Sequence, residues 1–154
     1  MADSASPNDT APPESWFRDS PDSSSLTAPR VLVPVFLDPE ELAPAIEFYE
    51  TLQGVKADMR LPLPDIGLDV AVVGGFSLIS GTEEARKPAS ALRAIVTVAD
   101  ADVSHQRLVA AGVEILQAPF PADVGRLMYA RHADGTVAEY IEHRPRPGEA
   151  GRPA

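Results

Sequence analysis

The side chains that could carry chemistry in this sequence gather near its C-terminal end, around residues 132–143. His132 ends a run of strand-forming residues, and the turn 133–136 leads directly into a second run that contains Glu139. Across such a hairpin, His132 would lie diagonal to Glu139 on one face of the sheet. The two groups could bind a metal ion weakly or work as an acid–base pair. Alternatively, His132 serves only to organise the turn.

Glu142 and His143 stand close to Glu139 in the sequence, but the geometry of a strand separates them. Successive side chains of a strand point to opposite faces, so Glu142 is expected to face away from Glu139. His143 lies roughly 13 Å further along, at about 3.3 Å per residue. The remaining histidine, His105, falls in the middle of an expected helix, where a structural role is the better interpretation. We therefore expect no cluster of ligands from these residues.

The composition excludes several classes of site and partner. The 154 residues contain no cysteine, which removes disulfides, thiolate zinc sites, iron–sulfur clusters and cysteine nucleophiles. A net charge of -10 disfavours nucleic acid and anionic membranes as partners. No apolar run reaches the roughly 18 residues that a membrane span needs, and no secretory leader is recognisable. The expectation is a cytoplasmic protein.

The two ends of the chain differ in composition from the part between them. Residues 1–29 hold seven Ser and five Pro without helical or strand periodicity, which predicts a disordered acidic tail. Within it, Trp16 and Phe17 are either stray aromatics or an anchor that docks on this protein or on a partner. Residues 145–154 are rich in Pro and Gly and predict a second flexible tail.

Residues 30–144 contain one plan of elements twice, as module one (30–81) and module two (92–144). Each module opens with a β-branched run, and Asp38 or Asp100 then caps a helix. Three further strand-like runs follow each helix: 55–63, 68–74 and 76–80 in module one, and 113–118, 126–132 and 136–144 in module two. A single β-α-β-β-β module cannot bury both faces of its sheet, so two must pair around a shared interior. This predicts an α+β protein whose strands curl into a half-barrel with the helices outside.

Two segments of this repeat, LDPEELAPAIEFYETLQGV and GRLMYARHADGTVAEYIEHR, resemble the vicinal oxygen chelate superfamily. That group contains glyoxalases, bleomycin-resistance proteins and extradiol dioxygenases. The characteristic parts are FYETLQG at the end of the first helix and HADGTVAEYIE near the C-terminus, and the resemblance spans residues 30–144. The superfamily includes lyases, dioxygenases, epimerases, thiol transferases and metal-free drug binders, so the residues of the site must decide the activity.

The resemblance also implies where a metal would be held, because family enzymes bind a divalent ion with one side chain from the first and one from the last strand of each module. On the first strands these positions are Val31, which has no lone pair, and Arg93, which keeps its proton and repels a cation. On the last strands they are Glu139 and a position within 78–80, where no carboxylate exists. One carboxylate does not hold a hard divalent ion. We therefore expect neither a metal nor another cofactor.

If positions 31 and 93 face the interior, the period of two in a strand predicts a mostly apolar cleft. Arg93 and Glu139 would be its polar exceptions, either joined in a buried ion pair or meeting a charged ligand. The lining side chains expected from the strands are Val31, Val33, Val35, Ile95, Thr97 and Ile141. Those expected from the rim loops and the residues beside them are Met59, Leu63, Phe120, Arg126 and Tyr129.

These features together predict a metal-independent protein that binds a small, largely apolar organic molecule, either to sequester it or to guide its rearrangement. One alternative is a glyoxalase-like lyase or isomerase, metal-free or with an unorthodox metal, in which Glu139 is the base or ligand, His132 the proton donor and Arg93 the oxyanion stabiliser. The other is an accessory protein that binds a partner through its acidic tail. Pairing into a homodimer stays open, since a dimer would cover exposed sheet edges.

Overall fold

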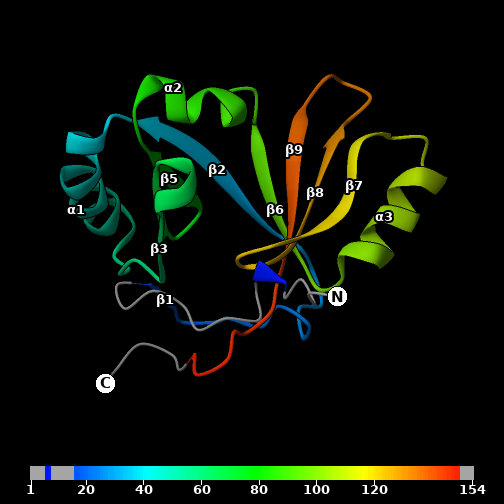
Figure 1. Ribbon diagram of the computed structural model, residues 1–154, viewed down its shortest axis with the longest axis horizontal. Coiled ribbons are helices and arrows are strands. Elements are labelled where there is room, and N and C mark those ends of the chain that lie inside the picture. Colours follow the sequence, from blue (N-terminus) through cyan, green and yellow to red (C-terminus); the bar gives the residue numbers. More distant parts are fainter. Residues whose placement is uncertain (1–5, 8–15, 150–154) are drawn as a thin grey trace, which may run out of the picture.

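The structure, a computed structural model, describes residues 6–7 and 16–149 and contains one mixed sheet of nine strands (Figure 1). The strands are β1 (Phe17–Arg18), β2 (Arg30–Leu37), β3 (Met59–Leu63), β4 (Leu68–Val73), β5 (Phe76–Ser80), β6 (Ala94–Val98), β7 (Glu114–Ala122), β8 (Gly125–Arg131) and β9 (Val137–His143). The helices are α1 (Leu42–Gln53), α2 (Glu83–Arg86) and α3 (Ala101–Ala110), with 3-10 turns at Pro39–Glu41, Pro64–Ile66 and Lys87–Ala89. None of these helices, within the described residues, has the length and apolar character needed to cross a bilayer.

The two predicted modules are present and occupy the two halves of the sheet. The strand order is β1-β3-β4-β5-β2-β6-β9-β8-β7, in which β2 to β5 form the first module and β6 to β9 the second. Each opening strand pairs in parallel with the last strand of its own module, while β2 and β6 pair antiparallel and join the modules. The sheet curls so that the two halves face each other, with α1 and α3 on the outside (Figure 1). The predicted α+β half-barrel is confirmed.

The helices stay on the outside because each buries its apolar face on the outer side of its own module. Leu42 of α1 packs in a cluster with Val73 and Leu78, and α3 lies over a second cluster that contains Met128 and Tyr140. A third cluster fills the concave side between the modules. Both faces of the sheet are therefore apolar. The alternation of side chains along each strand decides which residues belong to the inner face and which to the outer face.

The N-terminus of α3 shows how strictly this alternation applies. Asp100 caps the helix as predicted, accepting a hydrogen bond from the Val103 backbone N–H at 3.0 Å. The carboxylate of Glu142, on the outer face of β9, accepts a second one from the Ala101 N–H at 2.9 Å. Glu142 thus points away from Glu139, as its position in the strand predicts.

The prediction of a disordered N-terminal tail is wrong for residues 16–29. Phe17 and Arg18 form β1, which pairs antiparallel with β3. Trp16 is 7% exposed and packs in the concave cluster with Met59 and Leu61. The polar composition of this segment conceals the buried side chains of Trp16, Arg18 and Ser23, which help to hold it against the rest of the domain. The remaining part of the predicted tail lies outside the described residues, except for Ser6 and Pro7.

The predicted flexibility of the C-terminal segment is likewise wrong for residues 145–149. Arg146 is 7% exposed, and its guanidinium lies over the Trp16 ring at 4.9 Å from the ring centre. Glu149 forms an ion pair of 2.6 Å with Arg18, which is fully buried. The two ends of the domain are therefore fastened to each other beneath the sheet, while residues 150–154 lie outside the described part of the chain.

Candidate functional site

The concave side of the half-barrel holds a cleft of about 510 Å³. Strands from both modules line it, and residues of the segment 84–92 contribute to the lining. Its walls are mostly aliphatic, with side chains that include Leu32, Leu61, Val70, Ile79, Leu127 and Ile141. Such a cavity lies within the size range of small-molecule sites, whose walls are mainly apolar with a few placed polar groups.

The first polar group of the cleft is the Glu139 carboxyl. Glu139 sits on β9 directly opposite Tyr129 of β8 and beside Ile95 of β6. Burial among apolar side chains raises the pKa of Glu139 to about 7, although a hydrogen bond from the Tyr129 hydroxyl works in the opposite direction. Burial, and then the neighbouring carboxylate, raise the pKa of Tyr129 well above its ordinary value, so the phenol stays protonated. Near neutral pH the carboxyl can therefore donate or accept a hydrogen bond.

The second polar group is the imidazole of His143, which borders the same cleft. Its Nδ1 lies 3.0 Å from a guanidinium nitrogen of Arg18. Burial, reinforced by the positive charges of Arg18 and Arg30, lowers the pKa of His143 to about 3. The ring is therefore neutral at all ordinary pH values.

Six of the predicted site residues line this cleft. Tyr129 faces Glu139 from the neighbouring strand, as described above. The complete set is Glu139, Met59, Leu63, Ile95, Tyr129 and Ile141. Phe120 lies beside the cleft, with its ring stacked on that of Tyr129 at 6.0 Å between centroids.

The predicted facing of β2 is wrong by one residue. Leu32, at 4% exposure, pairs with Ile95 and lines the cleft, whereas Val31 and Val33 are 58% and 49% exposed on the outer side. Val35 packs into the cluster beneath α1. The resemblance implies equivalent positions, Val31 and Arg93, that stand equally far before Asp38 and Asp100, but β2 is offset by one residue from that placement, and such a shift exchanges the faces of a strand.

The predicted Arg93–Glu139 ion pair is absent. Arg93 is exposed, and its guanidinium donates hydrogen bonds to the backbone carbonyl oxygens of Ser90 and Leu92 at 3.2 and 3.1 Å. It lies just before β6 begins, where the chain has not yet entered the interior. A charged side chain at this edge stays in water and avoids desolvation.

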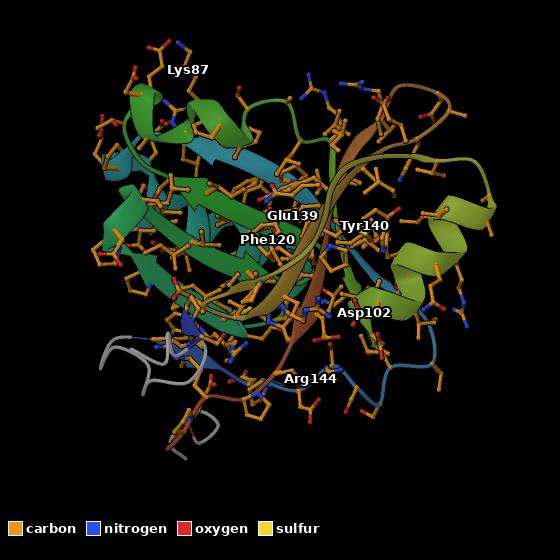
Figure 2. All side chains as sticks on the ribbon, turned by 45° about the vertical axis from the view of Figure 1, so that its right-hand side comes forward. Lys87, Asp102, Phe120, Glu139, Tyr140 and Arg144 are labelled. Atoms are coloured by element: carbon orange, nitrogen blue, oxygen red, sulfur yellow. The ribbon has the colours of Figure 1, made fainter. Side chains whose placement is uncertain are left out.

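His132 also lies apart from Glu139. Its Nε2 is 2.7 Å from the Tyr140 hydroxyl, and Tyr140 belongs to the outer cluster beneath α3. In Figure 2, Glu139 lies toward the interior of the half-barrel, whereas Tyr140 lies on the side of α3. The backbone N–H of His132 donates to the Thr136 carbonyl at 2.8 Å across the turn.

Two further predicted lining residues lie elsewhere. Arg126 lies on the outer face of β8 and forms an ion pair with Asp102 of α3. Thr97 faces the concave side as predicted and is buried, but it does not line the cleft.

The side chains at the implied metal positions do not form the donor set of a four-ligand divalent site. Val31 faces outward and Arg93 is exposed, while Ile79 is the residue of 78–80 that reaches the cleft. Across the described ranges, 6–7 and 16–149, no three side chains of the His, Cys, Asp or Glu type come together as metal ligands would. Glu139 remains as a carboxyl in an apolar wall.

Sequence reasoning missed Arg18 and did not assign His143 to the cleft. Arg18 lies in a segment whose composition predicts disorder, so nothing local marks it as buried. For His143 a signal was available, because residues 139, 141 and 143 alternate onto one face of β9. Judging His143 only by its distance from Glu139 concealed that both border one elongated cavity.

Comparison with known proteins agrees with this architecture. No protein-family model matches the chain, and no curated protein matches it. The crystal structure of an uncharacterized protein from Methanosarcina mazei is similar, with 36% identity, a TM-score of 0.67, and coverage of 75% of this chain and 92% of that one.

Two methylmalonyl-CoA epimerases share the fold at lower identity. The Mycobacterium tuberculosis enzyme is 21% identical, with a TM-score of 0.58 and coverage of 80% of this chain and 92% of that one. The Streptomyces coelicolor enzyme, in complex with 2-nitronate-propionyl-CoA, is 19% identical, with a TM-score of 0.54 and coverage of 72% and 94%. With the paired modules, the half-barrel and these similarities in place, the chain belongs to the vicinal oxygen chelate superfamily of glyoxalase-like and bleomycin resistance-like proteins.

Proposed function

We propose that the cleft binds a small, largely apolar organic molecule, and that it does so without a metal ion. The observation that carries this proposal is a mostly aliphatic cavity of about 510 Å³ in which Glu139 and Tyr129 form a carboxyl–phenol pair. Removing apolar ligand surface from water supplies the affinity, at roughly 25 cal/mol per Å². The polar pair supplies the orientation, because a buried polar group needs a partner.

The polar pair also indicates which ligand group it would meet. An ionised Glu139 already accepts a hydrogen bond from Tyr129 and has lone pairs left for a ligand hydroxyl or N–H. A carboxylate is the stronger acceptor, so such a ligand favours the ionised form. We therefore expect aromatic alcohols to bind better than the parent hydrocarbons.

The experiment is a calorimetric titration of chelator-treated protein with 2-naphthol at pH 8. One-site binding should persist unchanged after Mn²⁺, Fe²⁺, Zn²⁺ or Ni²⁺ is added and the excess is removed. Leu63→Glu, which places a charge in the cleft wall, should abolish binding. Val31→Glu is the matched control on the outer face and should bind as the wild type does.

Two outcomes would contradict the proposal. Stoichiometric retention of a metal after desalting would remove its metal-independent part. Equal binding by the Leu63→Glu and Val31→Glu variants would place the ligand outside the cleft.

Metal-free proton transfer is a second candidate function, favoured by the raised pKa of Glu139. A carboxyl whose pKa is about 7 is matched to general-base work at neutral pH. His132 and Arg93 take no part, because the structure places both away from this carboxyl. The test is exchange of the α-hydrogens of 2-tetralone for deuterium in D₂O. Acceleration by the wild type and not by Glu139→Gln supports catalysis, and equal rates oppose it.

A further inference from the structure

We propose that His143 is a specificity-determining donor of this cleft, and that Arg18 positions it by dictating which ring nitrogen carries the proton. The cleft would then select, among small apolar molecules, those that present a hydrogen-bond acceptor such as a carbonyl oxygen to His143. This inference deepens the proposed function and rests on it.

The guanidinium of Arg18 is fully buried, and all five of its N–H groups have partners. The Nε–H and one N–H of NH2 bind the Glu149 carboxylate at 2.8 and 2.6 Å. The second N–H of NH2 binds the Arg144 carbonyl oxygen at 2.8 Å. One N–H of NH1 binds the Val124 carbonyl oxygen at 2.7 Å, which leaves the other for His143. The guanidinium is therefore held on every side.

The contact between Arg18 and His143 settles the tautomer of the imidazole. A guanidinium has no lone pair and can only donate, so Nδ1 of His143 must accept. Because the ring is neutral, its single proton then resides on Nε2. The backbone of His143 is fixed as well, since its N–H donates to the Ser23 hydroxyl and its carbonyl accepts from the Ser23 N–H, both at 3.0 Å.

The Nε2–H is the part of His143 that a ligand would meet. Within the described part of the chain, Nε2 makes no hydrogen bond, and the imidazole borders the cleft. His143 is 4% exposed, so little solvent reaches this N–H, and an acceptor brought by a ligand would give it a direct partner. The same N–H offers nothing to a ligand that carries only apolar groups or only donors.

Glu139, Ile141 and His143 project from the same face of β9, so Glu139 and His143 lie at different heights along the cleft. Their Cα atoms are separated by four strand residues, roughly 13 Å at about 3.3 Å per residue. In Figure 2, Glu139 lies in the middle of β9 and Arg144, the residue after His143, lies at its lower end. Glu139 and His143 are therefore two separated polar points of the cleft, and a ligand that reaches both would be an elongated apolar molecule with an acceptor at one end and a hydroxyl or N–H at the other.

The charges around His143 keep this donor constant across the usual pH range. Arg18, Arg30 and Arg144 oppose protonation of the ring, and burial opposes it most strongly. Glu149 favours protonation, but its carboxylate is already bound to Arg18. Selection by His143 should thus be independent of pH, while Glu139 titrates near 7.

The first experiment compares two probes of similar shape, 2-acetylnaphthalene and 2-ethylnaphthalene, by calorimetry at pH 8.5, where Glu139 is mainly ionised and cannot donate. The wild type should prefer the ketone by about fivefold in Kd, as one hydrogen bond implies. His143→Gln should keep the preference, because an amide can accept from Arg18 and still donate to the ligand. His143→Leu should lose it and retain 2-ethylnaphthalene. Ser77→Ala, which removes another hydroxyl donor of the cleft, should keep it.

The outcomes separate this inference from the proposed function. If 2-ethylnaphthalene binds as tightly as the ketone, the inference is overturned and the apolar binding site stands. If the preference disappears in Ser77→Ala instead, the donor is misassigned. If neither probe binds, the proposed function fails and this inference fails with it.

The second experiment reads the tautomer without any ligand. Long-range ¹H–¹⁵N correlation of protein labelled in its three histidines should give one ring with a protonated Nε2 and an unprotonated Nδ1 from pH 5 to 8. His143→Gln should remove that ring from the spectrum. In Arg18→Gln the ring should lose its fixed tautomer, a change that a purely structural role of His143 would not require. A protonated Nδ1 in the wild type would overturn the inference.

Discussion

Glu139 of β9 lies directly opposite Tyr129 of β8, and this pairing places a carboxyl and a phenol side by side in a mostly aliphatic wall. Directly opposed residues of antiparallel strands project to the same side of the sheet. The next residue, Tyr140, projects to the other side and packs beneath α3. The pKa of Glu139 is therefore raised because its carboxyl faces the interior of the half-barrel.

The first prediction concerns stability and Glu139→Gln. The pKa of this carboxyl rises from 4.5 in a model peptide to about 7 in the fold, so the folded state binds the proton more tightly. The stability that the protonated form contributes is complete below pH 4.5 and is lost as the pH rises through 7. Relative to the wild type, Glu139→Gln should therefore gain on the order of 2 to 3 kcal/mol in free energy of unfolding between pH 4.5 and pH 8.5.

Urea denaturation of both proteins at the two pH values measures this difference. Glu114→Gln, on an exposed ion pair with Arg131, is the control and should show no comparable gain. A Glu139→Gln variant whose stability relative to the wild type is the same at both pH values would contradict the prediction.

The second prediction concerns Tyr129→Phe. The hydroxyl of Tyr129 stabilises the ionised carboxylate and so holds the pKa of Glu139 lower than burial alone would. Its removal should raise the titration midpoint of Glu139 by about 0.5 to 1 pH unit. Carbon-13 NMR of the labelled carboxyl follows the midpoint, and Tyr140→Phe on the opposite face should leave it unchanged. A lower midpoint in Tyr129→Phe would refute the hydrogen bond.

The third prediction concerns Arg18→Met. This substitution leaves the Glu149 carboxylate, two carbonyl oxygens and Nδ1 of His143 without their buried donor. Loss of one partner from such a buried network costs about 3 to 5 kcal/mol. Urea denaturation should show this loss, whereas Arg131→Met, on an exposed pair, should change the free energy of unfolding by less than about 1 kcal/mol. Similar effects of the two substitutions would mean that the terminal segments do not stabilise the domain.

The fourth prediction tests the register of β2. Leu32→Glu places a charge in the concave cluster and should lower the free energy of unfolding by more than about 3 kcal/mol. The same substitution at the neighbouring Val31, which is 58% exposed, should change it by about 0.5 kcal/mol or less. Thermal or urea denaturation distinguishes the two, and a reversed order would restore the inward facing of Val31 that the family resemblance implies.

The amino-acid sequence by itself determined the architecture of this protein. The repeated order of a β-branched run, a capping Asp, a helix and three strands is local information, and burial of one face of each module requires the two to pair. The family resemblance implies that positions 93 and 139 face inward, and the alternation along each strand then placed Ile95 and Ile141 on the concave side and turned Glu142 away.

The tertiary structure decided what stands next to Glu139 and what closes the cleft. Arg93 was the expected partner and lies in solvent, while Tyr129 occupies that place because the hairpin of β8 and β9 opposes residues 129 and 139. Arg18 comes from a polar segment without periodicity, yet it is buried against His143, 125 residues away in the sequence. Periodicity reports which face a residue takes within its own element. Contacts across the sheet depend on the register between strands and on how distant segments satisfy each other's hydrogen bonds, and neither leaves a trace in the local pattern.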